Sequence, residues 1–361
     1  MDIPYIAVID PETAALCGII DVYQSLVTRE TLNDVGDWEL TLPATDAAID
    51  ALRVGRMLNV QGFSGLIEEI SIAQTDDGAD VMTACGSDLG GLLSARLALP
   101  GAGQEYAEYS GEPAAVMASI VADNCIDAEP ARNYPQLMIG AVDETDEVIT
   151  WQTRYEVVSD VLRDIAGAHG LTWRIRYDAG DMLLDIRRAQ DHSAGSDSPV
   201  IYSPEYDNVT GQSYTHSVAG SANVALAAGS GTGAEREVCW VGDSQLRGLA
   251  RRETYLALKS YSSLADDAAA QLSARYSPAL AFEGSLLETG PFQYGVHWQL
   301  GDTITVQHLA WGVSMDVRVT EIEHVYEGDT VQLVATFGES AITLVDAIKR
   351  TIAPAQDDMR R

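Results

Sequence analysis

Apolar and polar residues alternate along much of the chain, which is the pattern of strands with one buried and one exposed face. In DWELTLP, residues 37–43, the side chains of Trp38, Leu40 and Leu42 fall on one side, and those of Glu39 and Thr41 fall on the other. Comparable stretches are 55–73, which alternates around a glycine-containing turn at 62–65, 76–86, the region from 199 onwards, and 301–338. The alternation predicts a mainly β protein.

Three segments have the spacing of helices instead. One begins at Pro113, a residue suited to a first helical turn, and the clearest covers 154–170 and stops at Gly170. A third covers 262–276. Residues 171–188 read as a hairpin that turns at 178–181, so a small α+β unit is expected within 113–190. The Gly-, Ser- and acid-rich stretch 100–112 is expected to be a linker before it.

The stretch AAGSGTGAERE, residues 227–237, carries three closely spaced glycines, which raises the question of a phosphate-binding loop. A Walker loop needs a lysine after the last glycine, and a dinucleotide loop needs a helix after it. This stretch has neither, and strand-like residues lie on both sides. We therefore expect the glycines to supply positive φ angles in a hairpin turn.

Two β-rich stretches resemble one another. VGRMLNVQ (54–61) is similar to LGDTITVQ (300–307), and the spacing from Ile70 to Gly86 equals that from Ile322 to Gly338. The main difference is an earlier turn that is six residues shorter. Residues 54–86 and 300–338 are therefore predicted to be divergent copies of one unit, with chance likeness between antiparallel strands as the alternative.

The charge of the chain excludes one class of function. There are 54 Asp and Glu against 22 Lys and Arg, a net charge of −32. Binding nucleic acid in a groove requires cations that neutralise phosphates, and an anionic membrane would repel this chain as well. The excess acid can serve solubility, or it can form a surface that DNA passes without adhering.

No catalytic or metal site stands out among the side chains. The four cysteines show no C-x-x-C spacing, and the six histidines form no H-E-x-x-H pattern. No G-x-S-x-G motif occurs. We therefore expect no enzyme activity, no cofactor and no metal, and no apolar run is long enough to insert in a membrane.

Several segments, in order, resemble the tail-hub family of long-tailed siphophages, whose fold is similar to that of contractile-phage baseplate hubs. The segments are GDWELTLP, GFSGLIEEI, GSDLGGLLSARLALP, VIYSPEYDNVTGQSYTHSVAGSANVALAAGSGTGAEREV, GLARRETYL and GDTITVQ…WGVSMDVRVTEIEHVYEG…ATFG. Together they span about residues 20–340. The resemblance singles out eight structural signature residues, namely Trp38, Glu39, Gly62, Gly65, Arg251, Arg252, Gly301 and Asp302.

The resemblance implies a homotrimer in which each subunit contributes two similar β-barrel domains, so that three subunits form a pseudo-sixfold ring. The first barrel would take residues 1–100 with 199–245, an α+β insertion would take 101–198, and the second barrel would take 246–361 with a helical insertion near 255–295. The duplication of residues 54–86 and 300–338 is what such a ring requires.

The resemblance also implies a place and partners. The ring would continue the tail tube at the tip of a virion and let DNA pass without specific binding. Its neighbours would be the distal tail protein or tail tube, the tape measure protein, and tip or fibre proteins. Relatives often carry long C-terminal extensions, whereas this sequence ends at TIAPAQDDMRR, so cleavage of the host wall and receptor binding are expected in other proteins.

Two alternatives stay open at this point. One is the hub of a related particle, such as a gene-transfer agent or a bacteriocin. The other is a secreted carbohydrate-binding or hydrolase module, in which some of the six Trp and fifteen Tyr would line a sugar groove.

Overall fold

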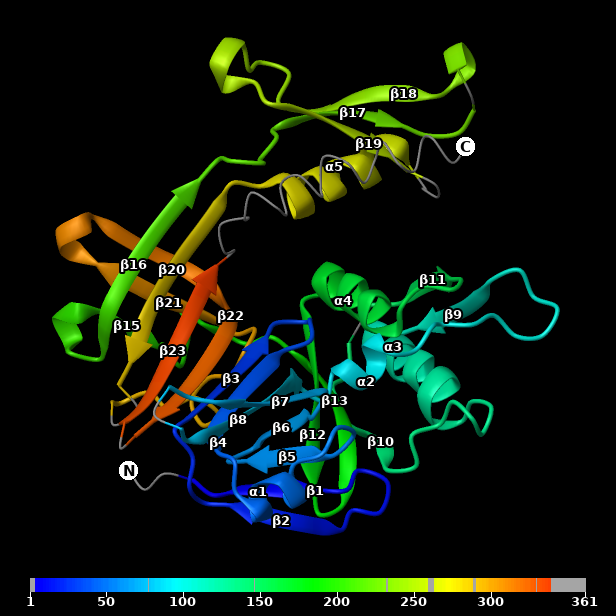
Figure 1. The fold of residues 1–361 in the computed structure, drawn as a ribbon. Coiled ribbons are helices and arrows are strands. Elements are labelled where there is room, and N and C mark those ends of the chain that lie inside the picture. Colours follow the sequence, from blue (N-terminus) through cyan, green and yellow to red (C-terminus); the bar gives the residue numbers. More distant parts are fainter. Residues whose placement is uncertain are drawn as a thin grey trace. The chain divides into compact units, whose positions relative to one another are not determined.

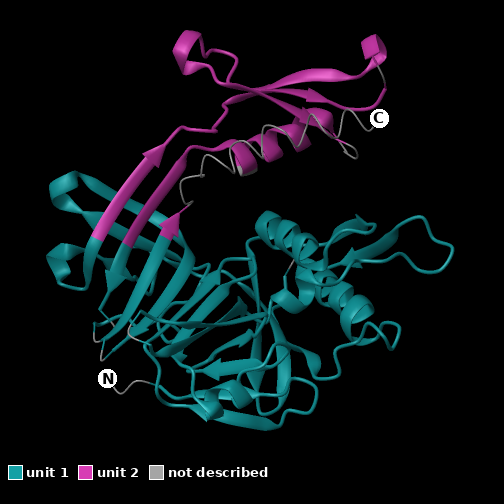
Figure 2. Cartoon of the chain, in the orientation of Figure 1, with its two compact units in different colours: residues 1–211, 284–336 teal, residues 212–283, 337–361 magenta. Residues whose placement is uncertain are grey.

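The chain divides into two compact units (Figures 1 and 2). Unit 1 comprises residues 1–211 and 284–336, and unit 2 comprises residues 212–283 and 337–361. The computed structural model describes residues 4–76, 78–145, 147–231, 233–258, 263–287, 290–328 and 330–338. Strands predominate, so the mainly β class predicted from alternation is confirmed.

The largest sheet has eleven strands. Its main path runs β16-β20-β23-β22-β3-β4-β8-β7, while β21 pairs with β22, and β14 and β15 pair with β21. The strands are β3 (Ser25–Thr31), β4 (Asp37–Pro43), β7 (Glu69–Gln74), β8 (Asp80–Ser87), β14 (Asp191–His192), β15 (Ile201–Tyr202), β16 (Val209–Ser217), β20 (Ala279–Leu286), β21 (Thr303–His308), β22 (Val313–Glu327) and β23 (Thr330–Gly338).

A second sheet of unit 1 packs on one face of the large sheet. Its order is β2-β1-β5-β6, and helix α1 (Asp46–Ala51) packs beside it. The strands are β1 (Ile6–Ile9), β2 (Leu16–Ile20), β5 (Met57–Val60) and β6 (Phe63–Leu66). The core between the two sheets includes Ile6, Trp38 and Leu40, all buried. The predicted alternation in residues 37–43 therefore marks the buried side of β4 correctly.

The turn expected at 62–65 lies earlier in the chain. Strands β5 and β6 are joined by Gln61 and Gly62, whose φ angles are 43° and 88°. Positive φ at both central residues is typical of tight hairpins. Gly65 instead lies inside β6, where an added Cβ would stand 2.3 Å from Nε1 of Trp38. A glycine is needed at position 65, but it is needed for close packing and not for a turn.

The region around 113–190 forms the expected α+β arrangement. Sheet β10-β13-β12 is covered by two helices, and the hairpin turns between Asp178 and Asp181 as predicted. The elements are α2 (Gly91–Ser94), α3 (Pro113–Val121), η1 (Ala122–Ile126), α4 (Val158–His169), β10 (Leu137–Val142), β12 (Leu171–Asp178) and β13 (Asp181–Arg188). Helix α4 ends at Gly170, with φ of 65°, but it begins four residues after the predicted start.

The stretch 100–112 is not only a linker. Its last residues form β9 (Ala107–Gly111), which pairs with β11 (Ile149–Thr153). Ala107 is buried in this pair, with exposed Glu108 beside it, and this short alternation was hidden among the small and acidic residues.

In unit 2 a three-stranded sheet packs on one helix. The order is β18-β17-β19, formed by β17 (Val224–Ala228), β18 (Val238–Gly242) and β19 (Glu253–Ala257), with α5 (Leu264–Tyr276) on one face. The glycine stretch 227–237 joins antiparallel β17 and β18, and Gly231 and Gly233 have φ of 92° and 57°. The hairpin predicted there is confirmed.

The two similar stretches share an unusual hydrogen-bond pattern. Gly55 and Gly301 both have φ of 90°. The amide of Gly55 donates to the carbonyl of Ile67, and that of Gly301 donates to the carbonyl of Val319. The return bonds run to the carbonyls of Arg56 and Asp302.

The six-residue difference between the two stretches is also accounted for. Strand β5 has four residues and β21 has six, and the connections are 61–62 and 309–312. The second hairpin is therefore longer by two residues in each strand and two in the loop. Gly86 and Gly338 at the far ends have different neighbours, because an added Cβ would meet the carbonyl of Leu66 in the first copy and that of Leu280, outside the repeat, in the second. The hydrogen-bond pattern that the two stretches share favours duplication over chance likeness.

None of the sheets formed by the described residues closes into a barrel, so the expected pair of barrel domains is not confirmed within a single subunit. The division at 1–100 with 199–245, 101–198 and 246–361 stays a prediction, and residues 339–361 of its last part lie outside the described ranges. None of the described helices is both long and apolar enough to span a bilayer.

We predict that Gly65→Ala lowers the free energy of unfolding by about 1–3 kcal/mol, because the new methyl group would overlap the buried indole of Trp38. Denaturant unfolding measures the change. Gly167→Ala is the matched control, since this exposed α4 position has open space around it and alanine favours helix by up to about 1 kcal/mol. Equal stability of the two variants would contradict the tight Trp38 contact.

Candidate functional site

The outward side of the large sheet in unit 1 carries a group of acidic side chains. Directly paired residues of neighbouring strands point to the same side. One row across β22, β3 and β4 is Glu323, Arg29 and Asp37, and the next row includes Glu39 of β4 and Glu69 of β7, which flank Cys85 of β8. We define the acidic face by six charged residues on this side of the sheet, namely Arg29, Asp37, Glu39, Glu69, Glu321 and Glu323.

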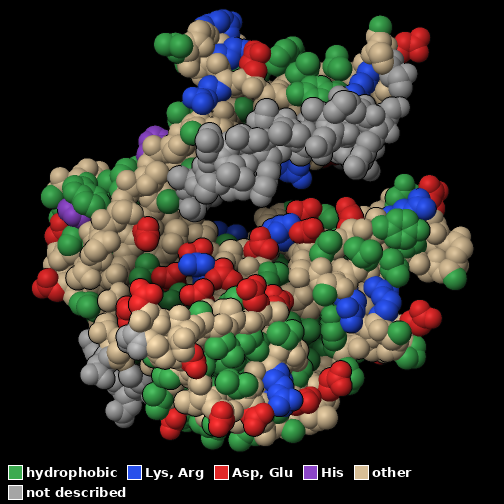
Figure 3. Space-filling model, viewed as in Figure 1, with side chains coloured by type: hydrophobic (Ala, Val, Ile, Leu, Met, Phe, Trp, Pro, Cys, Tyr) green, Lys and Arg blue, Asp and Glu red, His purple; other side chains and the backbone are tan. Residues whose placement is uncertain are grey.

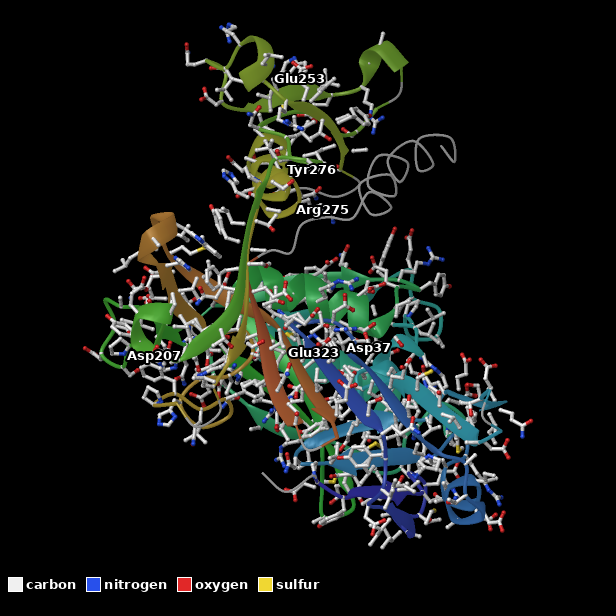
Figure 4. The ribbon with its side chains drawn as sticks, turned by 60° about the vertical axis from the view of Figure 1, so that its left-hand side comes forward. Asp37, Asp207, Glu253, Arg275, Tyr276 and Glu323 are labelled. Atoms are coloured by element: carbon white, nitrogen blue, oxygen red, sulfur yellow. The ribbon has the colours of Figure 1, made fainter. Side chains whose placement is uncertain are left out.

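The figures show the same surface. In Figure 4, Asp37 and Glu323 lie near one another on β4 and β22. In Figure 3, acidic side chains gather across the middle of unit 1, with few basic ones among them. The opposite side of these strands is apolar and packs on the second sheet, so the acids occupy the side that the fold leaves open.

Arg29 organises this face. Its guanidinium contacts Asp37 at 2.9 Å, Glu323 at 2.7 Å and Glu321 at 3.4 Å. Burial opposes the charged form of Arg29, but the hydrogen bond to Glu323 and the charge of Asp37 outweigh it and raise the guanidinium pKa. One cation is therefore shared among three carboxylates, and the carboxylates of Glu39 and Glu69 have no such partner among the described contacts.

Cys85 is the one thiol on the acidic face. Its partial burial and the charges of Glu69, Glu39 and Glu68 raise the pKa of the thiol. A thiol needs a lowered pKa to act as a nucleophile, so the acidic surroundings keep Cys85 protonated and unreactive. The acidic face therefore presents negative charge, and its one thiol is not an activated nucleophile.

Glu30, which follows Arg29 in β3, points inward to a cavity of about 210 Å³ in unit 1. Glu30 accepts a hydrogen bond from the hydroxyl of Tyr294 at 2.7 Å, and burial raises the pKa of its carboxyl. Arg174 and Arg187 also line this cavity. Within the ranges that the structure describes, no three His, Cys, Asp or Glu side chains gather as a metal site needs.

A protein-family model matches most of the sequence. The model of the Siphovirus ReqiPepy6 Gp37-like protein matches residues 5–339. The chain belongs to this family. The family is one of siphovirus tail proteins, so the resemblance drawn from the sequence segments is confirmed at that level. A search of curated proteins found no match.

Solved structures similar to the chain are also tail proteins. The tail protein of Neisseria meningitidis MC58 is 15% identical with a TM-score of 0.60, over 96% of this chain and 99% of that one. The 43 kDa tail protein of prophage MuSo2 from Shewanella oneidensis is 14% identical with a TM-score of 0.58, over 92% and 97%. The prophage tail protein gp18 of Listeria monocytogenes EGD-e is 10% identical with a TM-score of 0.58, over 98% and 100%. At these identities the likeness concerns the fold alone.

Two of the four N-terminal residues singled out from the sequence, Trp38 and Gly65, meet at one contact. The indole N–H of Trp38 donates to the carbonyls of Leu66 and Ser87, at 3.1 Å and 3.2 Å. Gly65 lies against the same ring, and Gly62 forms the preceding turn. Glu39, the next residue along β4, points to the acidic face. Thus Trp38 and Gly65 hold the two sheets together, Gly62 forms a turn within one sheet, and Glu39 contributes surface charge.

Gly301 and Asp302 anchor β21 in unit 1. An added Cβ on Gly301 would stand 2.3 Å from Thr172. The buried carboxylate of Asp302 accepts hydrogen bonds from the Arg187 guanidinium at 2.7 Å and from the amides of Gln190 and Gln299 at 2.9 Å and 2.7 Å. These bonds join Arg187 of β13 to the segments just before β14 and β21 of the large sheet, so the pair is structural.

Arg251 and Arg252 precede β19 in unit 2 and point to different surroundings. Arg251 contacts Glu253 at 2.6 Å and lies over the ring of Trp240. Arg252 donates to the carbonyl of Ser221 at 3.2 Å. The eight signature residues therefore do not form one site.

Sequence reasoning overlooked the residues that define the acidic face on β3 and β22. Arg29 lies in SLVTRET, and Glu321 and Glu323 flank Ile322 in VTEIEHV. The alternation of acids with apolar residues at 320–324 was available as a signal. The contact of these acids with Arg29 could not be predicted, because it depends on pairing between strands almost 300 residues apart.

We predict that Arg29→Met lowers the free energy of unfolding by about 1–2 kcal/mol at low salt, because three clustered carboxylates lose their shared cation. The loss should shrink in 1 M NaCl, where the charges are screened over about 3 Å. Chemical denaturation at both salt concentrations measures it.

Arg53→Met is the control for this experiment, since Arg53 makes a single exposed ion pair with Asp50. We expect a change below about 0.5 kcal/mol there. A salt-independent loss in Arg29→Met would mean that Arg29 acts through packing and not through charge.

Proposed function

We propose that the protein is the hub subunit of a phage tail, forming a threefold ring at the tail tip through which DNA leaves the virion. The observation that carries this proposal is the internal repeat, whose two copies share the turns at Gly55 and Gly301 and the same hydrogen bonds. Two similar units in each of three subunits would give six equivalent positions, which lets a trimer continue a sixfold tube. Membership in a tail-protein family supports the same assignment.

The open sheets fit a ring in which closure comes from assembly. In the described residues the large sheet ends at β16 and β7 without closing. Exposed strand edges invite pairing with another chain. We propose that the tube-like barrels expected from the sequence arise only when neighbouring subunits complete these sheets.

The acidic face would line the channel in this proposal. Proteins that hold DNA neutralise its phosphates with Lys and Arg, whereas this face has five acids and one Arg, whose charge its neighbours already share. Phosphates would meet like charge and no ion-pairing partner. The role is non-catalytic, with the distal tail protein or tail tube, the tape measure protein and tip or fibre proteins as neighbours in the virion.

Electron microscopy and light scattering of the purified protein test the ring. We expect threefold rings with a central pore and the mass of a trimer. If the chain alone is monomeric, the distal tail protein should be added as a template surface for assembly. A monomer that persists with the neighbouring tail proteins present would refute the ring.

We further predict that Glu39→Lys/Glu69→Lys makes the ring retain DNA. Two reversals in each of three subunits would supply six cations, and six phosphate contacts should weaken about 10³-fold between 50 and 200 mM salt. Electrophoretic binding assays on the ring and DNA-ejection rates of the virion measure the effect. Glu129→Lys/Glu144→Lys changes the charge equally at exposed positions on other segments, and equal DNA retention by both variants would exclude the acidic face as the channel wall.

A further inference from the structure

The excess negative charge of the chain is confined to one unit. Residues 1–211 and 284–336 contain 43 Asp and Glu against 12 Lys and Arg. Residues 212–283 and 337–361 contain 11 acids against 10 bases. Unit 2 is thus almost neutral in a chain of net charge −32. Repulsion between copies would be strong wherever one unit 1 meets another, and weak where unit 2 meets unit 1.

One face of the three-stranded sheet in unit 2 has no covering element among the described residues. Helix α5 packs on the side that presents Ala225, Val241 and Leu256. The other side presents Trp240 and Val238, which are 55% and 56% exposed. Trp240 aligns with Leu226 of β17 and Tyr255 of β19 in a single row across the sheet. Trp240 lies on the edge strand β18, and a large aromatic residue left in water on a sheet is characteristic of an interaction surface.

Two arginines lie on the same side. The guanidinium of Arg251 is 5.3 Å from the ring of Trp240, and that of Arg236 is 6.0 Å from the ring of Tyr255. Cation–π contact places each guanidinium against an aromatic ring of the sheet. The charge of Arg251 is balanced by the carboxylate of Glu253 at 2.6 Å, which lies on the same side, and Arg236 donates to the carbonyl of Gly229 at 3.1 Å. Tryptophan, tyrosine and arginine are also the residues that most often dominate binding energy at protein interfaces. We call this surface the Trp240 face.

We propose that the Trp240 face docks on the acidic unit 1 of a second copy of this chain, and that this contact builds the ring. The inference rests on the proposed threefold hub and names its interface. Charge selects the partner, because the apolar face of the nearly neutral unit 2 can approach the acidic unit 1 with little repulsion, whereas two copies of unit 1 would repel one another. A contact between two different patches is head-to-tail, and such contacts close into rings when the rotation permits.

The test compares trimer dissociation of the wild-type protein and Trp240→Ala by mass photometry over a dilution series. We expect the trimer to dissociate at a concentration about 30-fold higher in the variant, the effect of removing an interface hot spot. Arg251→Gln should weaken the trimer in the same direction, and more at low salt than at high salt. Circular dichroism verifies that the exposed position tolerates the change.

Two control variants remove the same residue types, a tryptophan and an arginine, from positions outside the Trp240 face. Trp311→Ala removes a tryptophan of similar exposure, 49%, from unit 1. Arg275→Gln removes an arginine from α5, on the other side of unit 2 from Glu253 in Figure 4. Both should leave the dissociation concentration within about threefold of wild type. Weakening by Arg275→Gln equal to that by Arg251→Gln would overturn the assignment to the Trp240 face.

A photo-cross-linker introduced at Val238 identifies the molecule that binds the Trp240 face. In a mixture of ¹⁴N- and ¹⁵N-labelled chains, we expect mixed-isotope cross-links to residues 1–211 or 284–336. Cross-links within one copy, including those to residues 339–361, or links only to another tail protein in virions, would overturn the proposal. A trimer that survives Trp240→Ala refutes this interface and leaves the ring intact, whereas a wild-type chain that never forms a trimer refutes the ring itself.

Discussion

The close approach of Trp38 to Gly65 is the contact on which unit 1 depends. The indole fills the space between the two sheets, and its N–H bonds to carbonyls of β6 and β8, one in each sheet. A buried indole nitrogen without a partner would be costly, so the ring fixes the separation and register of the sheets together. Any side chain at position 65 would enter the space of the ring. One large residue and one absent side chain therefore position β4, and β4 in turn carries Asp37 and Glu39 to the opposite surface.

The acidic face follows from that placement by the alternation of strands, and it is not explained by stability. Five carboxylates on β22, β4 and β7 of one sheet repel one another, and a single arginine on β3, shared among three of them, offsets only part of the repulsion. Polar uncharged side chains at the same positions would keep the alternation without this cost. The fold therefore does not require these charges. A polyanion that passes over the acidic face would explain them, and this supports the proposed channel.

Much of the local structure could be predicted from sequence, and the pairing of distant strands could not. Residues 37–43, the hairpin at 171–188, the stop at Gly170 and the glycine turn at 227–237 each carry their own periodicity or positive-φ signal. The contact of Arg29 with Glu323 depends instead on β3 lying beside β22, and no local pattern encodes that choice. The stretch 100–112 was misread as a linker for a related reason. Its strand is stabilised by β11, about 40 residues later, and not by its own composition.

The same limit applies to the signature residues and to the exposed tryptophan. The sequence places Trp38 and Trp240 in strands of similar appearance, yet one is buried and the other is 55% exposed. Only the packing of α5 on the far side of its sheet leaves Trp240 in water.

At physiological salt charges are screened beyond about 8 Å, so the charge of unit 1 acts between copies only where their surfaces come into contact. The local surface at the point of contact therefore decides whether two copies bind. Trp240, with Arg236 and Arg251 against the aromatic rings of its sheet, supplies in unit 2 an apolar surface with little net charge. Separating the charge into one unit and the adhesive surface into the other would let identical chains assemble while their acidic faces stay free of one another.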